Sequence, residues 1–214
     1  MIRLKVDTND LRESETAIDE AIRILAGGGA VVYPTDTLYG LGVDATDGSA
    51  VAKIFKIKKR PEAKALPILI ANIEWAKKLA YVDKKIEKIL AAIWPGAVTV
   101  LLQHSYRLPS LVTAGQRTIA LRIPDYKLAY FLLEKFGKPL TATSANISGQ
   151  LPSNKIEEVL AQFNGQPYQP TLVLDAGDLL PSEPSTILDL SGPQPRITRI
   201  GPVSKEKLLK ILAL

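Results

Sequence analysis

The sequence predicts a mixed α/β fold. Segments with the apolar spacing of helices alternate along the chain with short runs rich in β-branched residues, as in a sheet covered by helices. The chain has 214 residues, of which 46% are hydrophobic, so a substantial core is expected. No internal repeat is visible, and the loop-rich stretch 162–170 is too short to separate domains. We therefore expect a single domain over residues 1–214, built around one twisted, mixed β-sheet with surrounding helices.

Helices are expected where apolar residues recur every three or four positions. A capping box of Asp10 and Glu13 is expected to start the first helix, because their side chains can satisfy free backbone N–H groups. Asp125, Asn154 and Ser204 are expected to cap later helices in the same way. The expected helices are 10–26, 49–59, 73–80, 84–94, 125–136, one from about 154 and one from about 204.

Strands are expected in short apolar runs bounded by glycine or proline. Pro34 and Pro124 each end such a run, because proline has no backbone N–H to donate to a sheet. The closely spaced last strands resemble hairpins and indicate a mixed sheet. The expected strands are 30–33, 66–71, 97–102, 118–123, 139–141, 171–174, 186–190 and 196–200.

The composition limits the kinds of ligand and catalytic site that can be expected. The net charge of +5 suits an anionic substrate or RNA, but it equally fits a slightly basic surface without a partner. The absence of cysteine excludes disulfides, thiolate zinc sites and a cysteine nucleophile. With His104 as the single histidine, a histidine metal cluster or a serine–histidine triad is not expected. No targeting signal and no apolar run of about 20 residues is visible, so we expect a cytoplasmic protein without a membrane partner.

A basic segment follows one of the expected helices. Val51 and Phe55 form an apolar stripe, and Lys58 falls on that stripe one turn later. A lysine that faces inward needs an anionic partner or an open cleft. Pro61 ends the helix directly after Arg60, whose charge is alternatively explained by a favourable interaction with the helix dipole.

A polar loop is the second candidate. Residues 141–149 follow a short strand and contain five hydroxyl or amide side chains, which bind phosphate or carboxylate oxygens. A hydrogen-bonded turn is the alternative. We expect an anionic-ligand site where residues 56–64 meet residues 143–149. The turn 34–42, with Thr35, and a pocket shared by Ser185 and Arg199 are weaker candidates, each also explicable as structure.

Taken in order, these segments resemble the YrdC/Sua5 family. The resemblance runs from about Thr16 to Pro202, and its matching segments are 33–42, 58–61, 94–99, 119–124, 143–149 and 184–187. It implies a basic concave cleft and an L-threonylcarbamoyladenylate synthase. Such an enzyme makes threonylcarbamoyl-AMP and pyrophosphate from L-threonine, bicarbonate and ATP. The product supplies the t6A modification of adenosine 37 in tRNA, through downstream threonylcarbamoyl transferase proteins.

The resemblance also implies residue roles. Lys58 and Arg60 are expected to be catalytic, ATP is expected as a substrate with Mg²⁺, and no side chain is expected to ligate a metal. The residues expected to bind ATP or threonine are Thr35, Lys64, Thr113, Arg122, Thr143, Ser144, Asn146, Ser185 and Arg199. Leu69 stands where many relatives carry a histidine that contacts threonine, and the additional C-terminal domain of longer Sua5 proteins is not expected.

Two other functions stay open at this point. One is a module of the same fold that binds tRNA or double-stranded RNA without synthase activity, although the interleaved aromatic residues of single-strand readers are missing. The other is carbamoyl transfer, as in hydrogenase maturation proteins. The cysteine-rich zinc modules of those proteins have no counterpart in a chain without cysteine.

Overall fold

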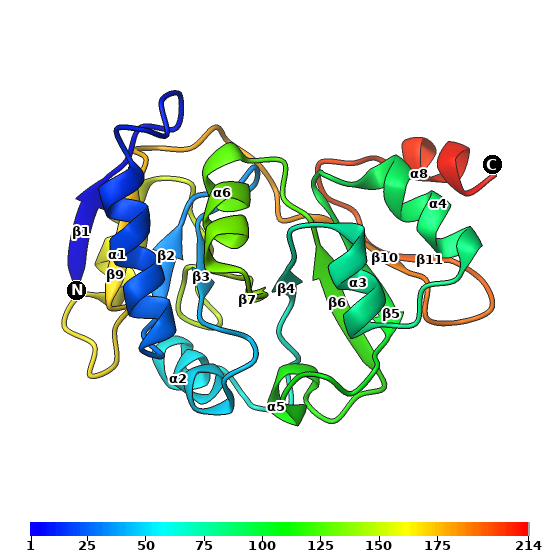
Figure 1. Ribbon diagram of the computed structural model, residues 1–214, viewed down its shortest axis with the longest axis horizontal. Helices are drawn as coiled ribbons and strands as arrows, with labels where there is room; N and C mark the ends of the chain where they lie inside the picture. The colour runs from blue at the N-terminus through cyan, green and yellow to red at the C-terminus, as the bar shows by residue number, and fades with distance from the viewer. Residues whose placement is uncertain (214) are drawn as a thin grey trace.

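The strands form two mixed sheets that lie beside each other. The computed structural model describes residues 1–213 and places the first sheet in the order β1-β9-β2-β3-β8 and the second in the order β11-β10-β5-β6-β4-β7 (Figure 1). The mixed α/β class is confirmed, whereas the expectation of one sheet is wrong. The strands are β1 (Ile2–Lys5), β2 (Val31–Tyr33), β3 (Gly40–Gly42), β4 (Ile68–Leu69), β5 (Val98–Gln103), β6 (Thr118–Arg122), β7 (Leu140–Thr141), β8 (Thr143–Ser144), β9 (Leu172–Asp175), β10 (Thr186–Asp189) and β11 (Arg196–Arg199).

The chain passes from the second sheet to the first at Ala142. This residue separates β7, which pairs with β4, from β8, which pairs with β3. Its N–H donates to the Pro67 carbonyl over 2.7 Å, and the Thr141 N–H donates to the Val43 carbonyl over 3.1 Å. The strands at this junction are two or three residues long, too short for a periodic pattern to show in the sequence.

The helices agree with the expected segments better in their ends than in their starts. α1 begins at Glu15 and not at Asp10, so the predicted capping box is wrong. The Asp10 carboxylate accepts hydrogen bonds from Arg12 instead, and the Ser14 hydroxyl bonds to the Asp7 backbone. The helices are α1 (Glu15–Ala26), α2 (Gly48–Lys58), α3 (Ile73–Leu79), α4 (Lys84–Ile93), α5 (Ser110–Thr113), α6 (Lys127–Phe136), α7 (Ile156–Phe163) and α8 (Lys205–Leu212).

Of the three later caps, one is confirmed. Ser204 caps α8 by accepting from the Lys207 N–H. The caps predicted at Asp125 and Asn154 are wrong, because α6 and α7 begin two residues later than those positions. The Asn154 amide instead donates to the Leu179 carbonyl, which ties the start of α7 to a distant loop.

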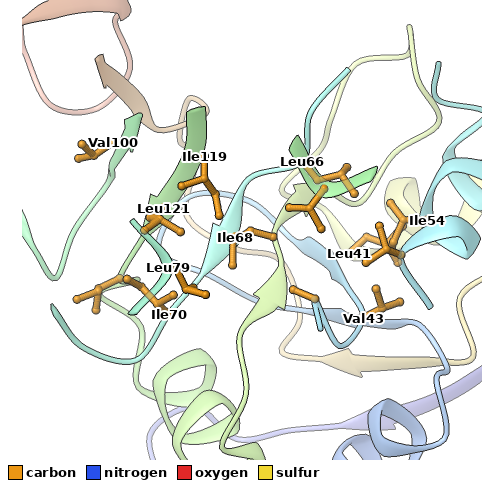
Figure 2. Packing of buried hydrophobic residues seen from close by; sticks show 14 of the residues in the cluster. Leu41, Val43, Ile54, Leu66, Ile68, Ile70, Leu79, Val100, Ile119 and Leu121 are labelled. Carbon is orange, nitrogen blue, oxygen red and sulfur yellow. The ribbon is translucent and has the colours of Figure 1, made fainter. Parts of the chain in front are cut away.

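The core covers both faces of the first sheet and one face of the second. α1 and α6 lie side by side over the first sheet and bury one apolar cluster against it (Figure 1). The larger cluster continues from the first sheet into the second: Leu41 of β3 and Ile54 of α2 lie near one end, and Ile68 and Leu121 of the second sheet extend it (Figure 2). Burial of this shared core holds the sheets in a fixed relation. Within residues 1–213, no helix combines the length and the apolar character needed to span a bilayer.

The glycines of β3 are predicted to be required for the close approach of Tyr33. A Cβ on Gly42 would lie 2.7 Å from the Tyr33 ring and 2.8 Å from the Thr141 carbonyl oxygen. Gly42→Ala is therefore expected to cost about 1–3 kcal/mol of unfolding free energy through overpacking. Gly48→Ala is the matched control, because its Cβ would meet nothing closer than 3.7 Å. Equal denaturation midpoints for the two variants would show that this contact is unimportant.

Candidate active site

A cavity of about 370 Å³ lies where the two sheets meet. The first sheet contributes the β2–β3 connection and β8, and the second contributes β4, β5, β6, β10 and β11. The structure thereby brings together residues from segments that lie far apart in the sequence. The predicted site residues that line the cavity are Thr35, Arg60, Arg122, Thr143, Ser144, Ser185 and Arg199.

Side chains alternate between the two faces of β5, and those on one face form part of the cavity wall. On β5, Thr99 and Leu101 line the cavity, whereas Val98 and Val100 point into the core. Sequence reasoning missed Thr99, whereas Thr37, which also lines the cavity, falls within the candidate turn 34–42. For Thr99 a signal was present, because a hydroxyl between two valines in a buried strand marks the face that does not pack into the core.

Three arginines give the cavity its charge. Arg60, Arg122 and Arg199 line it, and none of its described lining residues is an aspartate or glutamate. Burial lowers the pKa of each guanidinium from its usual value, and the nearby charge of Arg122 lowers the pKa of Arg199 further. Because arginine stays charged at neutral pH, an anionic ligand would relieve this repulsion.

Arg122 is the most firmly held of the three. Its Nε donates to the Gly96 carbonyl over 2.9 Å, its Nη1 to the Thr37 hydroxyl over 3.0 Å, and its Nη2 to the Asp36 carboxylate over 2.6 Å. The ion pair with Asp36 is largely buried, with side-chain exposures of 8% and 14%. Asp36 lies in the candidate turn 34–42, but its pairing with Arg122, 86 residues away, was not predicted. The contact with ATP or threonine expected for Arg122 stays a prediction.

The other two arginines are fixed through backbone carbonyl oxygens. Arg199 donates from Nε and Nη2 to the Ser185 carbonyl over 3.0 and 2.7 Å, which confirms that these residues share a pocket. Arg60 donates from Nε to the Lys64 carbonyl over 3.1 Å and from Nη2 to the Ala65 carbonyl over 2.7 Å. Among the described residues no hydrogen-bond partner occupies Nη1 of either arginine, so each retains donors for a ligand.

Four predicted site residues lie outside the cavity lining. Lys64 is exposed, while Thr113 is buried at the end of α5 and donates to the Ser110 carbonyl. Lys58 and Asn146 are both buried: Asn146 belongs to the loop that carries Ser144, and Lys58 donates hydrogen bonds to that loop. The inward orientation predicted for Lys58 is confirmed, since the residue is 2% exposed. The ligand contacts predicted for these four side chains stay predictions.

Leu69 forms part of the apolar floor. It lies in β4, next to Arg122 in the parallel register of β4 and β6, and it is buried. Tyr33 and Ala142 line the same cavity. At the position where the family resemblance places a histidine, this chain therefore offers hydrocarbon surface.

The charge on Lys58 is expected to make stability depend on pH. Burial, with a smaller contribution from Arg60, lowers the Lys58 pKa from 10.5 to about 7. Between these pH values the unfolded chain holds a proton that the folded chain has released, so folding stability rises with pH. Relative to Lys58→Met, the unfolding free energy of the wild type should rise between about pH 7 and 10.5, by at most about 1.4 kcal/mol per pH unit. Urea denaturation of both proteins across this pH range measures the difference in unfolding free energy. A difference that does not change with pH would contradict the lowered pKa of Lys58.

Comparison with known proteins identifies the family. A family model for Sua5, YciO and YrdC proteins, which carries the description telomere recombination, matches residues 23–201. This chain belongs to the Sua5/YciO/YrdC family. The match covers every predicted site residue, from Thr35 to Arg199.

Named relatives agree with this membership. The chain is 35% identical to the threonylcarbamoyl-AMP synthase of Pyrococcus abyssi over 89% of its own length and 57% of the relative's. It is 33% identical to a putative threonylcarbamoyl-AMP synthase of Mycobacterium tuberculosis, over 97% and 94% of the two chains. The crystal structure of P. abyssi Sua5 complexed with L-threonine superposes with a TM-score of 0.89 at 32% identity, covering 99% of this chain and 60% of that one. The chain thus spans about three fifths of the P. abyssi relative.

Proposed function

We propose that this chain is an L-threonylcarbamoyl-AMP synthase, a nucleotidyltransferase that uses L-threonine, bicarbonate and ATP. The observation that carries the proposal is the cavity with three arginines and several hydroxyls, in a member of a family whose named relatives are threonylcarbamoyl-AMP synthases. Every substrate carries a negative charge or a carboxylate, and clustered cations offset the repulsion between such groups. The product would supply t6A modification of tRNA through downstream transferase proteins.

The proposed chemistry has two bond-forming steps. The threonine amine attacks bicarbonate to give a carbamate and water, and a carbamate oxygen then attacks the α-phosphorus of ATP while the bond to pyrophosphate breaks. Arg60 and Arg199, which have free donors in the cavity, are assigned to the phosphates, whose leaving group gains charge. Proximity of the held reactants supplies the remaining acceleration, because no histidine or carboxylate is found among the described lining residues.

The amino-acid subsite is assigned to the floor of the cavity. Thr35 and Arg122 provide a hydroxyl and a cation there, and Leu69 provides apolar contact for the threonine methyl group. The threonine complex of P. abyssi Sua5 supports an amino-acid subsite in this fold.

Mg²⁺ does not fit this cavity as a metal held by the protein. The described lining residues offer hydroxyls and arginines but no carboxylate, the ligand that Mg²⁺ prefers. Across residues 1–213, no group of three or more histidine, aspartate or glutamate side chains is arranged to hold a metal ion. We propose that Mg²⁺ enters with the phosphates of ATP.

We also propose that the 214 residues act as one catalytic domain. The M. tuberculosis relative, a putative threonylcarbamoyl-AMP synthase that the chain covers almost completely, supports this proposal. The larger apolar cluster, which joins the two sheets, supports a single folding unit.

Pyrophosphate release from ATP tests the proposed function. Release by the purified chain is expected to require both L-threonine and bicarbonate, with threonylcarbamoyl-AMP as the second product in equal amount. D-threonine serves as the matched control, because it carries the same functional groups with the opposite configuration. Release that ignores threonine would refute the synthase. Tight tRNA binding that falls steeply with log salt, without such release, would favour the RNA-binding alternative.

A further inference from the structure

The ammonium group of Lys58 has no N–H left for a substrate. It donates to the Ser144 carbonyl, to the Asn146 carbonyl over 2.7 Å and to the Asn146 side-chain oxygen over 3.0 Å. An ammonium group has three N–H donors, and three acceptors account for all of them. To contact a phosphate, Lys58 would have to give up one of these bonds inside the protein.

The acceptors belong to one loop, residues 143–150, which is closely bonded within itself. The Ser144 hydroxyl donates to the Asn146 side-chain oxygen over 2.6 Å, and the Asn146 amide donates to the Ile147 and Gln150 carbonyls over 3.0 and 2.7 Å. The Ser148 N–H donates to the backbone carbonyl of Lys58 over 2.7 Å. Lys58 therefore holds this loop through both its side chain and its backbone.

Two walls of the cavity meet at this contact. Lys58 is the last residue of α2, and Arg60, two residues further on, lines the cavity. On the other side, Thr143 and Ser144 of the bonded loop line the cavity as well. The position of Arg60 relative to the hydroxyls of the 143–150 loop thus depends on the bonds that Lys58 makes.

We propose that Lys58 is a positioning residue that locks the 143–150 loop to the end of α2, and that its ammonium group does not contact the substrates. This inference rests on the proposed function for its effect on turnover. Because a small misplacement of binding groups has a large effect, loss of the lock is expected to lower kcat/KM for ATP by about 10- to 100-fold.

The test compares Lys58→Met with Lys53→Met at about pH 6, where the Lys58 amine carries its proton. Lys53 lies on the same helix and also donates to a backbone carbonyl, that of Gly28 over 2.7 Å, but it does not line the cavity. Amide hydrogen exchange in the 143–150 loop should rise about tenfold in Lys58→Met and stay unchanged in Lys53→Met. Affinity for inorganic pyrophosphate and KM for ATP should weaken in Lys58→Met alone.

Asn146→Ala provides a second variant in case Lys58→Met does not fold. It removes one of the three acceptors of Lys58, the Asn146 side-chain oxygen, and with it the amide donors to the Ile147 and Gln150 carbonyls, so it should raise the same exchange and the same KM. Both substitutions break the same contact between Lys58 and the loop. The KM for ATP of the double variant Lys58→Met with Asn146→Ala should therefore be no higher than that of the more impaired single variant. Weaker pyrophosphate binding in Lys58→Met with unchanged loop exchange would overturn the proposal, as would multiplying losses in the double variant or an Asn146→Ala variant without effect.

The exchange and pyrophosphate measurements need no turnover. If the wild type released no threonine-dependent pyrophosphate while the loop still loosened in Lys58→Met, the synthase would be refuted and the lock retained. If the wild type worked as a synthase while loop exchange stayed the same in Lys58→Met, the lock would be refuted and the synthase retained.

Discussion

Replacing Arg60 with alanine is expected to lower kcat/KM for ATP by about 10²- to 10³-fold, the loss seen when a group that stabilises developing charge is removed. Arg60 lines the cavity and retains donors beyond those it gives to the Lys64 and Ala65 carbonyls. The variant should remain folded, because these two bonds close a local turn of a few residues and do not join separate parts of the core. Steady-state pyrophosphate release, with thermal unfolding measured in parallel, checks both statements.

Arg12→Ala is the matched control. The Arg12 side chain is 90% exposed, pairs with the neighbouring Asp10 and lies outside the cavity, so its loss should leave kcat/KM unchanged. Arg60→Lys keeps the positive charge but loses the planar guanidinium, which can donate to a backbone carbonyl and a phosphate at once. Its kcat/KM for ATP should lie between those of the wild type and Arg60→Ala. Wild-type kinetics in Arg60→Ala would remove Arg60 from the site.

Replacing Arg122 with alanine is expected to abolish activity and also to destabilise the fold by about 3–5 kcal/mol. The substitution leaves the carboxylate of Asp36, whose side chain is 14% exposed, without its cation. It also removes the donors to Gly96 and Thr37, and the Thr37 contact holds the β2–β3 connection against β6. Chemical denaturation of the variant measures the loss of unfolding free energy.

A double variant separates the two effects. In Asp36→Asn with Arg122→Met no unpaired charge is buried, so much of the stability should return while activity remains lost. Recovery of activity in the double variant would show that Arg122 supports the fold and has no role with the substrates. Full stability in Arg122→Ala alone would contradict the energetic importance of the ion pair.

Local pattern was enough to predict most elements and the direction of one key side chain. The spacing of Val51, Phe55 and Lys58 predicted that Lys58 faces inward, because residues at positions i, i+4 and i+7 lie on the same face of a helix. The sequence did not reveal what Lys58 meets there. Its acceptors at Ser144 and Asn146 lie more than 80 residues away, and no local periodicity reports such a contact.

The starts of helices were less predictable than their phase. Asp10, Asp125 and Asn154 are residue types that favour a cap, yet each helix starts elsewhere. A side-chain oxygen can accept from nearby backbone, from a side chain or from a distant loop at similar energy, so tertiary contacts decide between them.

By itself the sequence determined the α/β class, the inward orientation of Lys58 and the ordered segments that mark the Sua5/YciO/YrdC family. All three depend only on the spacing and the type of residues along the chain. The tertiary structure alone decided that the strands divide into two sheets at Ala142 and that the cavity lies between them. It also decided that Asp36 pairs with Arg122. The physical reason is the same in each case: these features depend on hydrogen bonds and packing between residues far apart in the chain.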